Sequence, residues 1–212
     1  PLLYGIDAVH GNNNVKGAVI FPHNIGMGAT RSADLVRQEA EITAQEVAGC
    51  GMHWTFAPCI AVPRDERWGR TYEGFGETPE LQVMMAPAAV KGDQGTLSGA
   101  KTEILACAKH FIADGGTSGG KDQGNSIMTE EALRAVHLPG YIEAVKQGVG
   151  SIMVSYSSWN SGKMHAHKYL ITDVLKNELG FQGFVVSDYA AIDQLAPNYE
   201  DCITGAILAG ID

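Results

Sequence analysis

Short apolar segments of strand character alternate along this chain with helical segments, and this alternation limits the fold more than any other feature. The strand-like segments are rich in Val, Ile, Phe or Tyr and lie at residues 2–7, 52–57, 104–111, 151–156 and 184–188. Helical patterns lie between and after them, at residues 32–51, from 78, from 129 with an interruption at 139–140, at 167–180 and at 199–210. Repeated strand–helix units predict one α/β domain built on a parallel sheet.

Polar residues at the ends of these strands distinguish two parallel architectures. Asp7, Lys109, His110, Tyr156 and Asp188 each stand at the carboxyl end of a strand-like segment. A doubly wound sheet gathers its functional residues at one switch point, whereas a (β/α)₈ barrel collects them from the ends of several strands. The pattern therefore favours an α/β fold of the (β/α)₈ TIM-barrel type.

The length and the two ends of the sequence predict an incomplete barrel. A closed barrel needs eight strands and roughly 250 residues, so 212 residues with five visible strands correspond to about five or six of the eight βα units. The chain starts at Pro1 without a Met and stops at Asp212, where a new strand begins. We expect a piece of a larger protein, with open barrel edges that favour self-association.

Composition excludes several classes of function. With 45% apolar and 18% charged residues, the chain is expected to be globular rather than disordered. The net charge is −9, and no cluster of Lys and Arg interrupts the acidic balance, so neither nucleic acid nor an acidic membrane is an expected partner. No apolar run approaches the ~18 residues of a membrane span. The four cysteines form no CxxC pair, which leaves disulfide status open.

Two local motifs suggest other chemistry but match poorly. Residues 115–122 come within one residue of the phosphate-binding loop, yet Asp122 stands where a hydroxyl should meet Mg²⁺, and the next helix starts only near Thr129. His165 and His167 are spaced to reach one metal ion, but they lie well beyond the strand that ends at Tyr156. A metal-dependent barrel hydrolase is the weakest of three functions considered, and we expect no metal and no cofactor.

The residues at the strand ends form the stronger candidate site. An isolated Asp188 would be typical of a helix cap, but together with cations it suits the vicinal hydroxyls of a sugar. Adjacent Lys109 and His110 at a buried strand end need an anion or a hydroxyl-rich ligand to offset their desolvation. Aromatic faces for stacking on sugar rings can come from four residues: Trp68, Tyr156, Trp159 and Tyr189.

Six segments in order along the chain carry a family resemblance. They are YGIDAVHG at 4–11, FAPCIAVPRD at 56–65, RWGRTYE at 67–73, AKHF at 108–111, SYSSWN at 155–160 and VSD at 186–188. Together they closely resemble the N-terminal domain of glycoside hydrolase family 3, which contains β-glucosidases and exo-β-glucanases. Residues 1–212 are thus expected to be part of that domain's barrel, without the α/β sandwich domain that follows it in the family.

The resemblance implies a retaining hydrolase that acts at the non-reducing end of β-glucosides or β-glucans. It assigns Asp188 as the nucleophile of a covalent glycosyl-enzyme intermediate, consistent with the chemistry of carboxylate nucleophiles. Tyr189 stands where many members carry Trp, and is expected to contact the sugar of the next subsite. The residues that would bind hydroxyls in the −1 subsite are Asp7, Arg70, Lys109, His110 and Tyr156.

Two departures from the family pattern keep an alternative open. Plant-type exo-glucanases place a Glu in the Gly-rich loop near the position of Gln123, so no acidic role is implied there. The family's general acid/base usually comes from the second domain, and such a group is typically worth 10²–10⁴ in rate. The alternative function is therefore a catalytically incomplete, sugar-binding fragment. A periplasmic or extracellular location is suggested by the resemblance alone.

Overall fold

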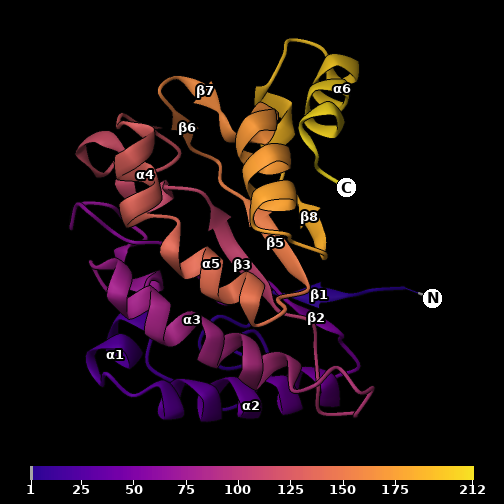
Figure 1. The fold of residues 1–212 in the computed structure, drawn as a ribbon. Coiled ribbons are helices and arrows are strands. Elements are labelled where there is room, and N and C mark those ends of the chain that lie inside the picture. The colour runs from indigo at the N-terminus through magenta and orange to yellow at the C-terminus, as the bar shows by residue number, and fades with distance from the viewer. Residues whose placement is uncertain (1) are drawn as a thin grey trace.

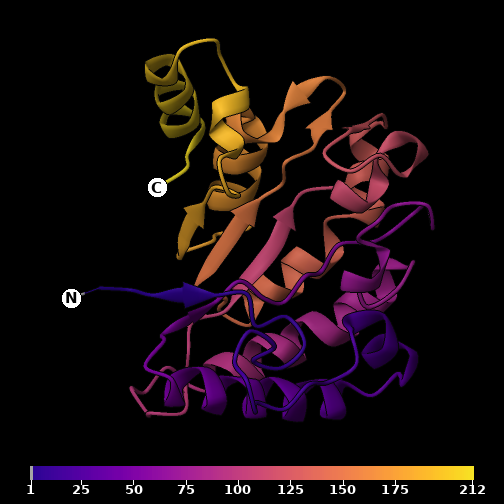
Figure 2. The same ribbon diagram turned by 180° about the vertical axis from the view of Figure 1, so that it is seen from behind.

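Five parallel strands form one curved arc in the computed structural model, which describes residues 2–212 (Figures 1 and 2). Strand β1 pairs with β2, and β3, β5 and β8 form a three-stranded sheet in that order. Bridges between Trp54 and Leu105 and between Cys59 and Lys109 join the two sets. The strands of the arc are β1 (Gly5–Ile6), β2 (Trp54–Thr55), β3 (Cys107–Phe111), β5 (Ser151–Val154) and β8 (Phe184–Val186).

The arc confirms the predicted TIM-barrel type of fold in incomplete form. All neighbours in it are parallel, and each of the five predicted strand segments contributes one strand. The regular strands are shorter than the predicted apolar segments. A second, small sheet lies beside the carboxyl ends of β3 and β5. Its strands are β4 (Asn125–Ser126), β6 (Ser158–Trp159) and β7 (Gly162–Lys163).

Helices cover the convex side of the arc, as comparison of Figures 1 and 2 shows. The two most extensive helix contacts are those of α3 with α2 and with α5. Residues 169–178 form a helix with π-type hydrogen bonds within the predicted helical segment 167–180. The α-helices are α1 (Asn24–Ala29), α2 (Ala33–Gly49), α3 (Pro79–Gln94), α4 (Glu130–Val136), α5 (Pro139–Lys146) and α6 (Tyr199–Ala209).

Helices α2 and α4 begin at the capping residues that the sequence predicts. Ser32 accepts a hydrogen bond from the Leu35 N–H at the start of α2, and Thr129 accepts one from Ala132 at the start of α4. The predicted interruption separates α4 from α5, because Pro139 opens a new first turn. These caps determine the residue at which each loop ends and the following helix begins.

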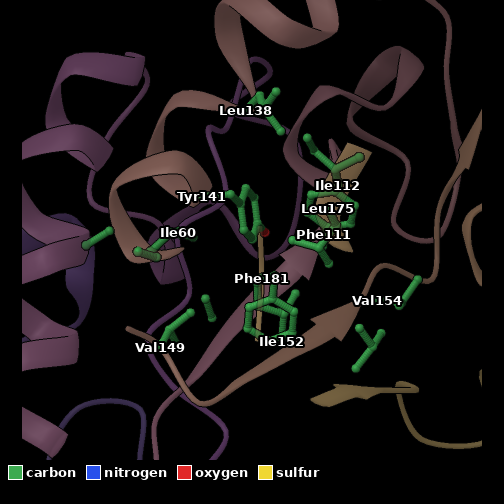
Figure 3. Packing of buried hydrophobic residues seen from close by; sticks show 14 of the residues in the cluster. Ile60, Phe111, Ile112, Leu138, Tyr141, Val149, Ile152, Val154, Leu175 and Phe181 are labelled. Carbon is green, nitrogen blue, oxygen red and sulfur yellow. The ribbon is translucent and has the colours of Figure 1, made fainter. Parts of the chain in front are cut away.

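The main hydrophobic core lies between the three-stranded sheet and its helices (Figure 3). Phe111 of β3 meets Tyr141 of α5 edge to face, with ring centroids 5.0 Å apart. Ile152 of β5 is fully buried, as is Leu175 of the π-helix. Each such side chain contributes about 1.5–3 kcal/mol through burial. The core thus fixes β3, β5 and β8 relative to one another, and with them the residues at their carboxyl ends.

Across residues 2–212, no helix combines the length and the apolar character required to cross a bilayer.

Candidate active site

A cavity of about 380 Å³ lies at the carboxyl ends of the strands. This volume falls in the range of small-molecule pockets, roughly 300–1,000 Å³. Six of the seven residues proposed from the sequence line it, although they are spread from residue 7 to residue 189. The lining residues are Asp7, Trp54, Phe56, Arg70, Lys109, His110, Met153, Val186, Ser187, Asp188 and Tyr189.

Strand ends deliver the polar side chains to this cavity. Asp7 follows β1 directly, and Asp188 stands two residues after the end of β8. Lys109 and His110 are consecutive in β3, where side chains normally alternate between faces. The register of β3 against β5 shifts between Lys109 and Phe111, and this irregularity accompanies the placing of both basic side chains in the cavity. The Lys109–His110 peptide bond is cis.

Two cations of the cavity each have an anionic partner. The Lys109 ammonium donates to Asp7 Oδ1 at 2.9 Å, with the lysine side chain 5% exposed. Arg70 donates twice to the Glu73 carboxylate, through Nε and Nη2, both at 2.9 Å. Burial alone would lower the pKa of Arg70, but the hydrogen bonds and the charge of Glu73 raise it. Both side chains are therefore held in place by their partners at the cavity wall, where they can donate to ligand oxygens.

His110 is held in one neutral tautomer. Its Nδ1 lies 2.8 Å from Asp114 Oδ2, and its Nε2 lies 3.1 Å from Arg70 Nη2. Because the guanidinium only donates, Nε2 is the acceptor and Nδ1 carries the proton. Burial, with the charges of Lys109 and Arg70, lowers the pKa of His110 to about 3. Burial raises the pKa of Asp114 to about 6, so at neutral pH this carboxyl is ionised and accepts the Nδ1 proton.

The two carboxylate oxygens of Asp188 have different surroundings. Oδ1 accepts a hydrogen bond from the Tyr189 N–H at 2.7 Å. Oδ2 lies 3.7 Å from His110 Nε2, a distance beyond a hydrogen bond. The backbone N–H of Asp188 donates to His165 Nε2 at 3.0 Å. One carboxylate oxygen is thus anchored, while the other has no hydrogen-bond partner among residues 2–212 and borders the cavity.

Tyr156 lies outside the lining of the cavity. Its hydroxyl donates to the Tyr189 carbonyl at 2.5 Å, and so supports the segment that carries Asp188. Tyr189 itself is 90% exposed at the rim. A direct contact between Tyr156 and a sugar therefore stays a prediction.

Of the four aromatic residues that the sequence offered for stacking on a sugar, Tyr189 lines the cavity and the other three do not. Trp68 is buried and donates from Nε1 to Asp122, and Trp159 donates to the Met128 carbonyl, so neither lines the cavity. Trp54 and Phe56 line it instead, with ring centroids 4.6 Å apart and edge to face. Their i, i+2 spacing in the predicted strand 52–57 is a signal for a shared face.

The two weaker motifs adopt other roles. Residues 114–120 form short 3₁₀ turns rather than leading into a helix, and Asp122 accepts the indole proton of Trp68. His165 has no free nitrogen for a metal, because Nε2 accepts from Asp188 and its other hydrogen bond goes to the Ser155 backbone. No cluster of three or more His, Cys, Asp or Glu arranged for a metal occurs within residues 2–212.

Parallel strands whose carboxyl ends surround a polar cavity define the class of (β/α)₈-barrel enzymes, whose active sites lie at this face. The whole chain, residues 1–212, matches the family model described as the glycosyl hydrolase family 3 N terminal domain. The chain belongs to glycoside hydrolase family 3.

Named relatives cover the whole chain. It is 37% identical to the lysosomal beta glucosidase of Dictyostelium discoideum and 36% identical to the periplasmic beta-glucosidase of Salmonella typhimurium, over 100% of its length in both cases. It spans only 27% and 28% of those two proteins. The family assignment is therefore secure for these residues, and the chain corresponds to about a quarter of each relative.

Solved structures agree with the sequence relatives. An exo-1,3/1,4-beta-glucanase from a Pseudoalteromonas species superposes with a TM-score of 0.88 and 51% identity, over 91% of this chain and 25% of that one. A beta-glucosidase from Listeria innocua gives a TM-score of 0.94 at 31% identity, over 100% of this chain and 30% of that one. The arc of five parallel strands is thus a shared architecture.

Proposed function

We propose that the chain is the sugar-binding and nucleophile-bearing part of a retaining β-glucosidase or exo-β-glucanase, which hydrolyses terminal β-D-glucosyl residues. The observation that carries this proposal is the Asp188 carboxylate, which has one oxygen anchored by the Tyr189 N–H and the other bordering the cavity. The names of the relatives support the same substrate class.

The walls of the cavity suit a single sugar ring. Asp7 and Lys109 offer an acceptor and donors side by side, and Arg70 offers a planar set of donors. Neutral His110 accepts from Arg70 through Nε2 and so orients this guanidinium at the cavity wall. Trp54 and Phe56 provide an apolar surface for the faces of the ring. Alternating donors, acceptors and apolar surface match a polyhydroxylated ligand.

In the proposed first step, the free Oδ2 of Asp188 attacks the anomeric carbon. A bond forms between Oδ2 and that carbon as the bond to the leaving glycosidic oxygen breaks, and a general acid protonates the leaving oxygen. In the second step, water attacks the same carbon while the conjugate base takes a proton from the water. The bond to Asp188 breaks as the bond to the water oxygen forms, the carboxylate is restored, and the product keeps the β configuration.

The general acid/base of this scheme is proposed to lie outside residues 1–212. Among the residues on the cavity wall, Asp7 is paired with Lys109, and Glu73 beyond the wall is paired with Arg70. The family resemblance points to the α/β sandwich domain as the source of this group. The cavity described here would then be the −1 subsite, closed by residues of that domain.

Replacing Asp188 in the intact protein that carries this chain tests the proposal. Asp188→Ala should lower the rate with a β-glucoside by about 10⁴-fold or more, since the nucleophile is lost. Adding azide should restore turnover and give the α-glucosyl azide, because azide would attack from the vacated side. Asp188→Ala with a tenth or more of wild-type activity would contradict the assignment.

A second candidate function applies to the 212-residue chain alone. Six of the seven residues proposed from the sequence line one cavity, and this supports sugar binding without turnover for the isolated chain. Calorimetric titration of the isolated chain with glucose should show saturable binding that Asp7→Asn weakens. Hydrolysis of a β-glucoside by the isolated chain at the rate of the intact protein would rule out this alternative.

We also propose an extracytoplasmic location, periplasmic or extracellular, for the intact protein. The support is the naming of one relative as periplasmic and of another as lysosomal. Fractionation of the source cells should place the β-glucosidase activity outside the cytoplasm. Activity that follows a cytoplasmic marker would contradict this location.

A further inference from the structure

We propose that His165 is a positioning residue, which holds the backbone of Asp188 so that its free carboxylate oxygen is aligned for attack. The proposal rests on the nucleophile role given to Asp188 under the proposed function. It concerns a histidine whose side chain borders no cavity wall and whose contact with Asp188 is through the main chain.

His165 connects the ends of two neighbouring strands. Its Nε2 accepts from the Asp188 N–H at 3.0 Å, beyond the end of β8. Its other hydrogen bond goes to the backbone of Ser155, one residue after the end of β5. Strands β5 and β8 are parallel neighbours, and their regular pairing stops at Met153 and Val186. The imidazole therefore replaces the backbone pairing that is missing at the point where the nucleophile leaves the sheet.

The environment of His165 keeps the ring in one neutral tautomer. The residue is 2% exposed, and burial lowers the pKa of its imidazole to about 4. Because Nε2 accepts from a backbone N–H, the ring proton lies on Nδ1, the nitrogen left to donate to Ser155. Each ring nitrogen thus has a single partner with a fixed sense of donation, and the geometry persists over the physiological range of pH.

The contact controls the nucleophile because the Asp188 side chain is fixed relative to its own backbone. Oδ1 is bound by the next residue's N–H, so any movement of the main chain carries the free Oδ2 with it. The next residue, Tyr189, has a side chain that is 90% exposed, and its carbonyl accepts from the Tyr156 hydroxyl on the far side of Asp188 from His165's contact. A displacement of about 1 Å at a reacting atom is enough to lower a rate by about 10²-fold.

Two polar substitutions separate the two hydrogen bonds of His165. In His165→Gln, the longer side chain places its amide oxygen near the Nε2 position and keeps an acceptor for the Asp188 N–H. In His165→Asn, the shorter amide reaches only the Nδ1 position and keeps the bond to Ser155. Both variants retain a polar group in the buried space, which limits the desolvation penalty and makes them a matched pair.

The experiment measures kcat and KM with an aryl β-glucoside, and Kd for glucose, in the intact protein. We expect His165→Asn to lower kcat by about 10²-fold, with KM and Kd close to wild type. We expect His165→Gln to restore kcat to within a few-fold of wild type. A role in stability alone would not produce this separation of kcat from binding, nor rescue by one amide and not by the other.

Two results would overturn the proposal. One is a folded His165→Asn variant with wild-type kcat. The other is equal loss of kcat in both variants with glucose binding weakened in parallel, which would indicate general disruption of the site. If one variant fails to fold, the other still tests the proposal. The proposal requires a kcat near wild type in His165→Gln and a strongly lowered kcat in His165→Asn. Substantial activity in Asp188→Ala would instead refute the proposed function, whatever the His165 variants show.

Discussion

At the scale of single residues, the cavity depends on side chains whose protonation is fixed by their neighbours. His110 donates to Asp114 and accepts from Arg70, and Lys109 is balanced by Asp7. Each of these side chains is therefore held in one orientation by its partner. The sugar-binding chemistry proposed for the cavity therefore depends on residues behind its wall as well as on those that line it.

Asp114→Asn should lower kcat/KM, because both oxygens of Asp114 are acceptors. Oδ1 accepts from the Gly115 N–H at 3.0 Å, and Oδ2 accepts from His110. An amide satisfies one donor and turns its NH₂ toward the other, which disfavours the His110 tautomer whose Nε2 accepts from Arg70. Loss of a hydrogen bond to a charged group, about 1.5–3 kcal/mol, corresponds to a decrease in kcat/KM of about 10- to 100-fold.

Steady-state kinetics on the intact protein measure this effect, with ¹⁵N shifts of the His110 ring reporting the tautomer. Asp122→Asn on the same loop is the control, since Asp122 contacts Trp68 and not the histidine. Unchanged kcat/KM and tautomer in Asp114→Asn would contradict the assigned role of Asp114.

Asp7→Asn should weaken glucose binding by about 10-fold or more, because it leaves the buried Lys109 ammonium without its anion. The double variant Asp7→Asn with Lys109→Met should lose less binding free energy than the sum of the two single variants. Calorimetric Kd values for the four proteins test the coupling. Additive losses would show that the ion pair does not shape the site.

The sequence predicted the strand-end residues well because position along a strand determines position at the mouth of the arc. Trp68 and Trp159, two of the aromatic residues named from the sequence as able to stack on sugar, lie outside the cavity lining, since loop residues have no such constraint. The contact of His165 with Asp188 was not predicted, because this hydrogen bond spans 23 residues and depends on the 3₁₀ turn Met164–Ala166 that follows β7. Asp114 lies four residues after His110, and this spacing is a sequence signal for a partner of the histidine.

At the scale of elements, the packing of α2 on α3 contains a feature unrelated to the active site. Glu39 of α2 and Asp93 of α3 both line a small internal cavity of about 20 Å³, enough for one water. Asp93 is 3% exposed, and its carboxyl has no hydrogen-bond partner among the described residues. Burial raises the pKa of Glu39 to about 7, and burial together with Glu39 raises that of Asp93 well above its usual value.

Glu39→Gln should stabilise the protein at alkaline pH and leave it unchanged in acid. A carboxyl with a raised pKa in the folded state contributes its full stability below the unfolded value of about 4.5, and loses it as pH rises through about 7. A shift from 4.5 to about 7 corresponds to about 3 kcal/mol, or about 6 °C in Tm or more.

Thermal unfolding at pH 5 and pH 8 measures the difference in Tm between Glu39→Gln and wild type. The exposed Glu77→Gln serves as a control, and its Tm difference should not grow with pH. A Tm difference for Glu39→Gln that is the same at both values of pH would contradict the raised pKa of Glu39.

The type of each helix or strand was predicted better than its length. The start of α2 at Ser32 and the break at Pro139 were readable, because capping and proline act locally. The sequence did not predict that the apolar segments 2–7 and 52–57 would form strands of only two residues. Strand length depends on a neighbouring strand that is distant in sequence. The π-type hydrogen bonds of residues 169–178 were likewise not predicted from the sequence.

At the scale of the whole molecule, the arc leaves apolar side chains exposed at both of its ends. Leu2 and Tyr4 precede β1, and Ile207 and Leu208 lie on α6; all four are exposed. Figures 1 and 2 place the N- and C-terminal parts on the same side of the arc. We propose that the isolated 212-residue chain self-associates through these edges, which agrees with the known tendency of open strand edges and apolar patches to associate.

Sedimentation velocity of the isolated chain should therefore show association that increases with protein concentration. The double variant Ile207→Glu with Leu208→Glu should shift the distribution toward monomer. Ile127→Glu removes an equally exposed apolar side chain away from these edges and should leave the distribution unchanged. A wild-type chain that stays monomeric over the accessible concentration range would contradict self-association.

The central claim is that Asp188 is the nucleophile of a retaining glycosidase, and covalent labelling tests it most directly. Incubating the intact protein with an activated 2-deoxy-2-fluoro-β-glucoside should trap the glycosyl-enzyme intermediate, because the fluorine slows its hydrolysis. Proteolysis and mass spectrometry should then locate one added 2-deoxy-2-fluoroglucosyl group on the peptide VVSDY, at Asp188. A label on any other carboxylate, or turnover without a trapped intermediate and with inversion at the anomeric carbon, would contradict the account.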